Sequence, residues 1–468
     1  MRKTHGRIAT VLVVIAFAFA AVVVACMIYR PDRALRTATG TAAHDLCSET
    51  FVSQLDPELV FAESLAPRSG FRWIAWAVNH HVDPIRREAR ASLLGTLPSR
   101  AVFREGVGCV LVHGNERIAT ATLRGAVPAE PLLPAIAGPV AVEAADPGLK
   151  AALDAAFLET QHPPHANTKA IVIVHNGRVI AERYAEGYGV NTPILGFSMT
   201  KSVVNALIGI LVRERKLAVD APAPVAAWSG SADPRRSVTV EQLMRMTSGL
   251  ALDETGSGFD PSNQMFYDEP DMAGYAQRAA LVAAPGTRWS YSSASTHLLA
   301  RIVRDRVGAT ADAVQRFAFR ELFDPLGMRS VTLEMDATGT PVGAHYMLAS
   351  ARDWARFGSL YLNDGVIGGR RILPEGWVQL STSPALGTPY GAGWWTNRGG
   401  TPAAMGRIKA GLPADAFFAF GNLGQRIAVI PSKRLVIVRM ARSNMPNGGG
   451  RDFDALVVEV ISSLGSAR

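Results

Sequence analysis

Gly-Phe-Ser-Met-Thr-Lys-Ser-Val-Val, residues 196–204, places a serine three residues before a lysine at the start of a long apolar run. On an α-helix, residues i and i+3 share a face, so the Ser198 hydroxyl and the Lys201 amine can come within hydrogen-bond reach. The positive end of the helix dipole favours negative charge at the same place. This spacing predicts an activated nucleophile. The alternative is an ordinary helix start, with Ser198 as the amino-terminal cap and Lys201 extending outward.

The composition is that of a large folded protein. The 468 residues are 48% hydrophobic and 19% charged, which allows a sizeable core and two or three domains. The formal net charge of +8 comes mainly from arginine spread along the chain, without a basic block or interleaved aromatic residues. This pattern indicates a solvated basic surface and gives no support to nucleic-acid binding.

Residues 1–36 differ from the rest of the chain. An uncharged apolar stretch of 22 residues, Ile8 to Tyr29, has basic residues on both sides. As a helix it is long enough to cross a bilayer, so the first expectation is a single amino-terminal anchor in a bacterial inner membrane. The positive-inside rule then places the rest of the chain on the periplasmic or extracytoplasmic side. A cleaved signal that releases a secreted protein is the second possibility, and lipidation at Cys26 is the third.

Two cysteines remain outside that segment, Cys47 and Cys109. In an oxidising compartment, two thiols in one region are more often bridged than free, so we expect a disulfide between them. Closing that loop would stabilise the fold by about 4 kcal/mol in the chain-entropy model. The alternative is a pair of buried, reduced thiols.

Three regions are expected along the chain. They are the amino-terminal segment 1–36, an accessory region 37–139 that ends in a Pro/Ala-rich stretch, and one domain over 140–468. Asn176-Gly177 separates two strand-like runs in the third region, which is typical of a two-residue hairpin turn. Helical patterns follow in its middle, and three strand-like runs and a helix close it. This order suggests an α+β or α/β architecture in which the first and last strands pair in one sheet.

A second segment, Pro-Gly-Thr-Arg-Trp-Ser-Tyr-Ser-Ser over 285–293, places Tyr291 on a loop that enters a helix. Alone, Tyr291 would be interpreted as a buried aromatic residue whose hydroxyl finds a partner. Together with the Ser198 segment and Met-Thr-Ser-Gly-Leu over 246–250, it resembles the serine hydrolase superfamily of class C β-lactamases and penicillin-binding-protein-like esterases. Ser-x-x-Lys is the acylation motif of penicillin-recognising enzymes. The resemblance extends from about Lys169 to Arg439.

Within that superfamily, the chain looks most like the branch of 6-aminohexanoate-dimer hydrolase and related carboxylesterases. The resemblance implies a β-lactamase/transpeptidase-like α/β sandwich, with an antiparallel sheet flanked by helices and an all-helical subdomain. It also implies an enzyme without metal or other cofactor. The segments that carry this closer resemblance are 352–358, 360–365, 390–395 and 421–425.

The resemblance assigns a role to each residue that matches the family's motifs. Ser198 would be the nucleophile, Lys201 the partner that accepts its proton, and Tyr291 the acid/base on the opposite side. The backbone N–H groups of Ser198 and Asn422 are the expected oxyanion donors. The residues expected to contact substrate are Ser293, Gly421, Gly424, Gln425, Trp394 and Trp395.

Two departures from the family pattern bear on the substrate. Ser293 stands where Asn is usual after Tyr291, and Ala419-Phe420-Gly421 stands where the family has Lys-Thr-Gly. That lysine helps to hold the carboxylate of a β-lactam, and Ala419 cannot. A neutral ester or small linear amide is therefore favoured as substrate, unless Arg426 or another arginine substitutes. The alternatives are a β-lactamase or D-amino-acid peptidase, or a relative that binds cell-wall peptide without turnover.

The base that activates Ser198 is left open by the sequence. A serine hydroxyl is a poor nucleophile until a base removes its proton, and an ammonium group cannot do so. Either an apolar pocket keeps Lys201 neutral, or Tyr291 shares the proton as a phenolate beside the Lys201 charge.

Overall fold

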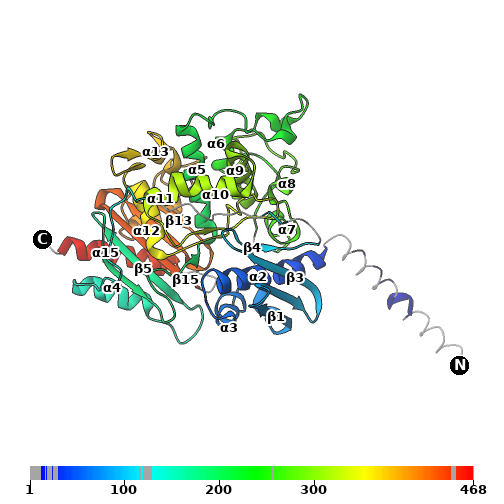
Figure 1. The fold of residues 1–468 in the computed structure, drawn as a ribbon, viewed down its shortest axis with the longest axis horizontal. Helices are drawn as coiled ribbons and strands as arrows, with labels where there is room; N and C mark the ends of the chain where they lie inside the picture. Colours follow the sequence, from blue (N-terminus) through cyan, green and yellow to red (C-terminus); the bar gives the residue numbers. More distant parts are fainter. Residues whose placement is uncertain are drawn as a thin grey trace.

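The computed structural model describes residues 12–15, 17, 20, 24, 30–114, 118–119, 129–255, 258–443 and 450–466. At its centre lies a six-stranded antiparallel sheet in the order β12-β13-β14-β15-β5-β6 (Figure 1). Strand β15 pairs with β5, so the two ends of the domain meet in the middle of the sheet. The strands are β5 Thr168–His175, β6 Arg178–Tyr184, β12 Trp395–Thr396, β13 Phe417–Phe420, β14 Arg426–Ile430 and β15 Leu435–Ala441.

The hairpin predicted at Asn176-Gly177 connects β5 and β6. Both turn residues have positive φ angles, 51° for Asn176 and 78° for Gly177, as a two-residue turn of this kind requires. Strand β5 is buried on both faces, and its alternate residues join different clusters. Ile171 and Ile173 pack with α4 and α15, whereas Val172 and Val174 belong to the main core. Apolar residues at every position therefore fit a strand covered on both sides.

Helices cover the two faces of the sheet and form a separate helical region beside it (Figure 1). Helix α5 is central to this region: it contacts α9, and residues 200–211 are all buried. An α+β architecture with an antiparallel sheet, flanking helices and a helical region is confirmed. The helices after the amino-terminal part are α4 Pro147–Phe157, α5 Thr200–Arg213, α6 Val240–Met244, α7 Pro261–Asp268, α8 Met272–Ala276, α9 Ser293–Val307, α10 Ala311–Ala318, α11 Asp324–Leu326, α12 Ala351–Leu362, α13 Trp377–Thr382, α14 Pro402–Lys409 and α15 Gly450–Ser466.

Two small sheets complete the domain. One has the order β7-β9-β8, and its strands are β7 Ile194–Leu195, β8 Thr332–Leu333 and β9 Met347–Ala349. The other pairs β10 Val366–Ile367 with β11 Arg370–Arg371. The three-stranded sheet is important for the site because β7 leads directly into Ser198.

The N-terminal layer, as we call it, consists of helix α2 (Pro31–Phe51), the short α3 (Pro57–Val60) and the antiparallel sheet β1-β2-β3-β4. Helix α2 packs on this sheet and on α7 of the helical region. A disulfide between Cys47 and Cys109 joins α2 to β4. The layer therefore lies against the domain that carries Ser198. Its strands are β1 Val78–Asp83, β2 Glu88–Leu93, β3 Thr96–Arg104 and β4 Gly108–Leu111.

The membrane anchor expected over residues 1–36 is contradicted. No helix in the described ranges combines the length and the apolar character needed to cross a bilayer. Most of the apolar stretch between Ile8 and Tyr29 lies outside the described residues. The first long helix, α2, buries polar side chains such as His44 and Asp45 against protein, so it belongs to the folded core. The anchor and the localisation were inferred from apolar composition, and the structure does not support either one.

Candidate active site

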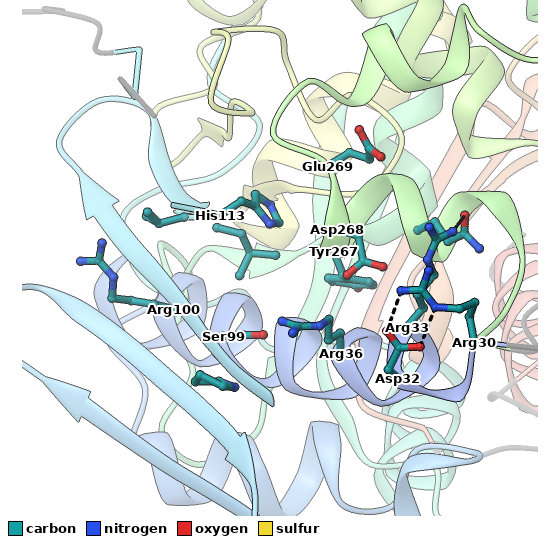
Figure 2. A pocket seen from close by; sticks show the side chains of 14 residues that line it. Arg30, Asp32, Arg33, Arg36, Ser99, Arg100, His113, Tyr267, Asp268 and Glu269 are labelled. Atoms are coloured by element: carbon teal, nitrogen blue, oxygen red, sulfur yellow. Dashed lines mark hydrogen bonds and ion pairs between the residues drawn. The ribbon is translucent and has the colours of Figure 1, made fainter. Parts of the chain in front are cut away.

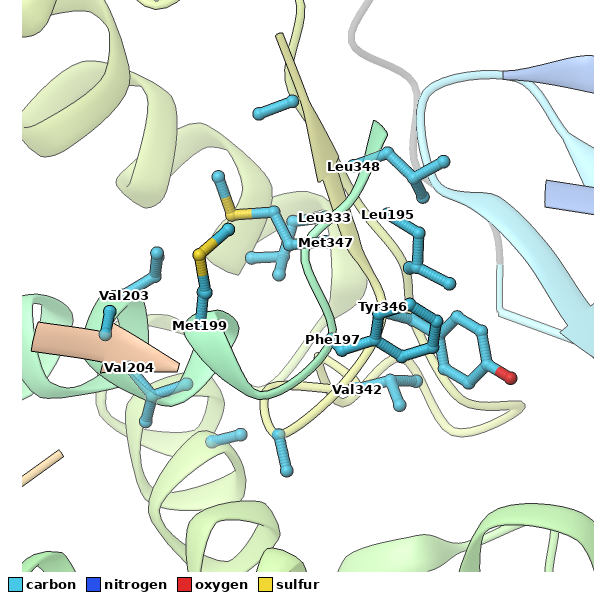
Figure 3. Packing of buried hydrophobic residues seen from close by; sticks show 14 of the residues in the cluster. Leu195, Phe197, Met199, Val203, Val204, Leu333, Val342, Tyr346, Met347 and Leu348 are labelled. Atoms are coloured by element: carbon cyan, nitrogen blue, oxygen red, sulfur yellow. The ribbon is translucent and has the colours of Figure 1, made fainter. Parts of the chain in front are cut away.

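A sharp turn presents Ser198. Strand β7 ends at Leu195, and the short helix η4 (Phe197–Met199) leads into α5. Phe197 has a φ angle of 48°, an uncommon left-handed conformation for a residue other than glycine, and its ring is buried in the apolar cluster of Figure 3. Gly196 is needed at the turn because a Cβ there would overlap the Trp354 ring. Ser198 is left half-buried at the start of α5.

Lys201 lies one helical turn further and points back to Ser198. Its Nζ donates to Ser198 Oγ at 2.9 Å, to Ser293 Oγ at 3.0 Å and to the Ala344 carbonyl at 3.2 Å. The side chain is almost completely buried. Burial lowers the pKa of Lys201 from 10.5 to about 8, although the charge of Glu254 acts in the opposite direction. A neutral amine is therefore accessible at mildly alkaline pH.

Tyr291 lies beside this pair, just before helix α9. Lys201 Nζ is 4.7 Å from the centroid of the Tyr291 ring. Burial raises the pKa of Tyr291 above its ordinary value of 10.0, and the Glu254 charge adds to this, whereas a hydrogen bond with Ser198 opposes it. Tyr291 therefore holds its proton at neutral pH, as a proton donor does. The structure brings the three predicted catalytic residues into one cluster.

Glu254 is a residue of the site that the sequence interpretation missed. Its Oε2 accepts hydrogen bonds from the Ser293 backbone N–H at 2.8 Å and from Ser262 Oγ at 3.2 Å. Its carboxylate charge acts on both Lys201 and Tyr291. Glu254 lies in a loop without a recognisable motif, so the sequence gives no signal for its role.

Two buried histidines also lie near Lys201. Burial lowers the pKa of His297 to about 4 and that of His345 well below its ordinary value, and the Lys201 charge acts in the same direction. Both rings are therefore neutral near pH 7. Among the described residues, no group of three or more His, Cys, Asp or Glu is arranged to hold a metal ion.

The end of β13 approaches the nucleophile turn closely. A Cβ on Gly421 would overlap the carbonyl oxygen of Gly196, so only glycine allows this approach. The backbone N–H groups of Ser198 and Asn422 have no hydrogen-bond acceptor among the residues that the structure describes. Two N–H groups without acceptors near a nucleophile can stabilise an oxyanion.

Three of the residues expected to contact substrate have structural partners instead. Ser293 is buried, and its hydroxyl accepts from Lys201. Both polar atoms of the Gln425 amide bond to the backbone of Ala441, with Oε1 accepting at 3.0 Å. Trp394 is completely buried and stacks on Phe357. These partners occupy the polar groups or surfaces of the three side chains, and a substrate contact stays a prediction for each of them.

The neighbouring Trp395 has the opposite environment. It is half-buried and stacks on Tyr291, with 5.9 Å between ring centroids. Tyr390 packs edge-on against Tyr291 at 5.8 Å, and Trp289 lies 6.1 Å from Tyr390. We call Trp289, Tyr390 and Trp395 the aromatic wall. It lines the Tyr291 side of the cluster.

Gly424 and Arg426 follow Gly421, the glycine that approaches the nucleophile turn. Gly424 is buried, and its carbonyl accepts from Arg439 at 3.2 Å. Arg426 donates to the carbonyls of Gly421 and Gln425 at 2.7 and 2.9 Å. Its guanidinium group thus binds backbone carbonyls. This does not favour Arg426 as a substitute for the lysine that holds a substrate carboxylate in the family.

A polar groove of about 510 Å³ lies elsewhere, between α2, β3 and α7 (Figure 2). Arg33 and Arg36 line one side, and Asp268 and Glu269 line the other. Tyr267 also borders it, and its hydroxyl is 3.4 Å from that of Tyr346. The groove is formed by the N-terminal layer and α7 and does not include the Ser198 cluster.

Comparison with known proteins identifies the family of the chain. The Beta-lactamase family model matches residues 155–460. The 6-aminohexanoate-dimer hydrolase of Paenarthrobacter ureafaciens is 26% identical over 230 residues, which cover 45% of this chain and 56% of that protein. The chain thus spans little more than half the length of this relative.

Solved structures show the same fold. A Bacillus anthracis protein provisionally named a 6-aminohexanoate-dimer hydrolase has a TM-score of 0.54 and 25% identity, covering 64% of this chain and 80% of that one. A family VIII carboxylesterase has a TM-score of 0.52 and 14% identity, covering 68% of this chain and 98% of the other. The family model covers more than half of the chain, and the protein therefore belongs to the beta-lactamase family.

Proposed function

We propose that the protein is a serine hydrolase that cleaves a carboxylic ester or a small linear amide through an acyl-enzyme on Ser198. The observation that carries this proposal is the 2.9 Å contact between Ser198 Oγ and the buried Lys201 Nζ. Because burial lowers the pKa of Lys201 to about 8, the amine can act as a base. The raised pKa of Tyr291 argues against a phenolate base.

The proposed reaction has two halves. Neutral Lys201 accepts the Ser198 proton while Oγ attacks the substrate carbonyl, and the resulting oxyanion is held by the N–H groups of Ser198 and Asn422. Tyr291 donates its proton to the leaving oxygen or nitrogen, the bond to the acyl carbon breaks, and Lys201 returns a proton to Tyr291. Water then attacks the acyl carbon while neutral Lys201 accepts its proton. The bond to Ser198 Oγ breaks as Lys201 returns that proton to Oγ, and the acid is released.

The substrate class follows from the charges around the cluster. Ala419 stands where the family's lysine would hold a carboxylate, and Arg426 is engaged by backbone carbonyls. Glu254 adds a negative charge beside Lys201. These features favour a substrate without a carboxylate at this position over a β-lactam. The names of two matched proteins, a 6-aminohexanoate-dimer hydrolase and a family VIII carboxylesterase, also support an ester or amide as the substrate.

Labelling by a fluorophosphonate tests the nucleophile. We expect the intact mass of the wild-type chain to increase by one phosphonyl group, and peptide mapping to place the adduct on Ser198. Ser198→Ala should give no adduct, whereas Ser202→Ala, a change one turn away on α5, should be labelled like the wild type. An adduct elsewhere, or its persistence in Ser198→Ala, would contradict the proposal.

The pH dependence tests the base. Because Lys201 must be deprotonated to accept a proton, kcat/KM for p-nitrophenyl acetate should rise with pH and level off above a pKa of about 8. Rates are measured from pH 5.5 to 9.5 after subtraction of spontaneous hydrolysis. Activity that falls as pH rises through 8 would point to a protonated group and would exclude Lys201 as the base.

A further inference from the structure

We propose that Asp45 in helix α2 is a positioning residue for the reaction. Through Tyr346 it holds the segment whose Ala344 carbonyl accepts from Lys201, and through Arg68 it holds the turn that carries Ser198. This inference rests on the proposed function. It gives the N-terminal layer a part in catalysis although none of its residues contacts the Ser198–Lys201 pair.

Asp45 connects two side chains with its two oxygens. The residue is completely buried. Oδ1 accepts from the Tyr346 hydroxyl at 2.7 Å, and Oδ2 accepts from Arg68 Nη2 at 2.8 Å. A buried ion pair contributes little net stability compared with well-packed apolar groups, but its hydrogen bonds have direction. The carboxylate therefore fixes where Tyr346 and Arg68 lie.

The hydrogen bond with Tyr346 connects Asp45 to the segment that contacts Lys201. Tyr346 is two residues from Ala344, whose carbonyl accepts from Lys201 Nζ at 3.2 Å. The next residue, Met347, accepts the Gly196 N–H at 2.9 Å and begins strand β9, which pairs with β7 before the nucleophile. Tyr346, Phe197 and Leu195 belong to the same buried cluster, part of which Figure 3 shows. A shift of Tyr346 would therefore move groups that contact both Lys201 and the Ser198 turn.

The hydrogen bond with Arg68 connects Asp45 to the turn that carries Ser198. The guanidinium carbon of Arg68 is 5.7 Å from the centroid of the Phe197 ring. Phe197 precedes Ser198 and holds the left-handed conformation of the turn. The His345 ring packs edge-on against Phe197, with 4.9 Å between centroids. Phe197 thus lies between the Arg68 guanidinium group and the segment that carries the Ala344 carbonyl.

A second buried carboxylate ties the same segment to the N-terminal layer. Glu334 accepts from Ser48 Oγ at 2.9 Å and from the Cys109 N–H at 2.8 Å, and it pairs with His44 at 2.9 Å. Its backbone N–H donates to the Tyr346 carbonyl at 2.9 Å. The His44 ring stacks on that of Tyr346 at 3.8 Å between centroids. Tyr346 is therefore held at its ring, its hydroxyl and its backbone.

The test compares Asp45→Asn and Tyr346→Phe with Glu88→Gln. Glu88 is a buried carboxylate of the same layer, paired with Arg90 and Arg100 in the small sheet. For each variant we would measure melting temperature, the rate of Ser198 labelling by a fluorophosphonate, and kcat and KM for p-nitrophenyl acetate, well below the melting transition.

We expect Asp45→Asn and Tyr346→Phe to lower kcat and the labelling rate by about 10- to 100-fold, with KM changed by less than about twofold, because small displacements of catalytic groups have effects of this size. Glu88→Gln should keep the wild-type rates even where its melting temperature falls.

The outcomes separate the two proposals. If folded Asp45→Asn and Tyr346→Phe label at the wild-type rate, the positioning role is wrong while the hydrolase proposal stands. The same conclusion follows if Glu88→Gln loses as much activity as they do. If Asp45→Asn does not fold, Tyr346→Phe decides, since it removes only one hydroxyl. A wild-type protein that is never labelled on Ser198 would overturn both proposals.

Discussion

Lys201→Met is expected to lower kcat/KM for p-nitrophenyl acetate by about 10⁴-fold, the upper end of the range for a positioned base. Lys201 donates directly to Ser198 Oγ, and burial lowers its pKa to about 8, whereas burial raises that of Tyr291. Methionine has a similar length and suits a buried apolar environment, so the variant removes the base with little change in volume. Steady-state rates and fluorophosphonate labelling measure the loss.

Lys201→Arg is the matched control for charge. A guanidinium group keeps the positive charge and donors but stays protonated, so this variant should be as inactive as Lys201→Met if the base is what matters. Activity retained by Lys201→Arg would instead show that the cation only provides electrostatic stabilisation. Activity above about one tenth of the wild type in Lys201→Met would exclude Lys201 as the main base.

Lys201 also makes the stability of the protein depend on pH. The pKa of Lys201 is lower in the folded protein than its ordinary value of 10.5, so the unfolded chain binds the proton more strongly between about pH 8 and 10.5. Keeping Lys201 charged below pH 8 therefore costs stability. Lys201→Met removes this charge, so its melting temperature should rise less between pH 8 and 10.5 than that of the wild type. A melting transition well above the assay temperature shows that the loss of activity is not caused by unfolding.

The part of the site that the sequence predicts is the part formed by local contacts. Ser198 and Lys201 meet because they are three residues apart at a helix start, and the Asn176-Gly177 turn fixes the first hairpin. The runs of apolar residues in β5, β14 and β15 likewise predict strands. These features depend on periodicity and turn chemistry within short segments, which a single sequence contains.

The part that the sequence does not predict depends on contacts between distant segments. Trp394 and Trp395 are adjacent and identical in type, yet alternate residues of an extended segment face opposite sides, so one is core and the other stacks on Tyr291. Glu254 and Ala344 reach Lys201 only through the tertiary fold. The membrane anchor was inferred from apolar composition alone, and it was wrong because no helix among the described residues is long and apolar enough to cross a bilayer.

Tyr291→Phe is expected to separate amide from ester hydrolysis. An amine leaves the tetrahedral intermediate only after its nitrogen is protonated, whereas p-nitrophenolate leaves as an anion. Because the pKa of Tyr291 is raised, its hydroxyl holds the proton that the amine needs. We expect kcat/KM for a small linear amide to fall by about 10³-fold and that for p-nitrophenyl acetate by only about tenfold.

Tyr390→Phe provides the matched control. Tyr390 is a buried phenol of the aromatic wall whose ring lies 5.8 Å from that of Tyr291, and its hydroxyl has no partner among the described residues. Removing that hydroxyl should leave the ratio of amide to ester rates unchanged. If the ratio changes in Tyr291→Phe but not in Tyr390→Phe, Tyr291 donates a proton to the leaving group. If Tyr291→Phe lowers both rates equally, Tyr291 acts before the leaving group departs, and the proton must come from Lys201 instead.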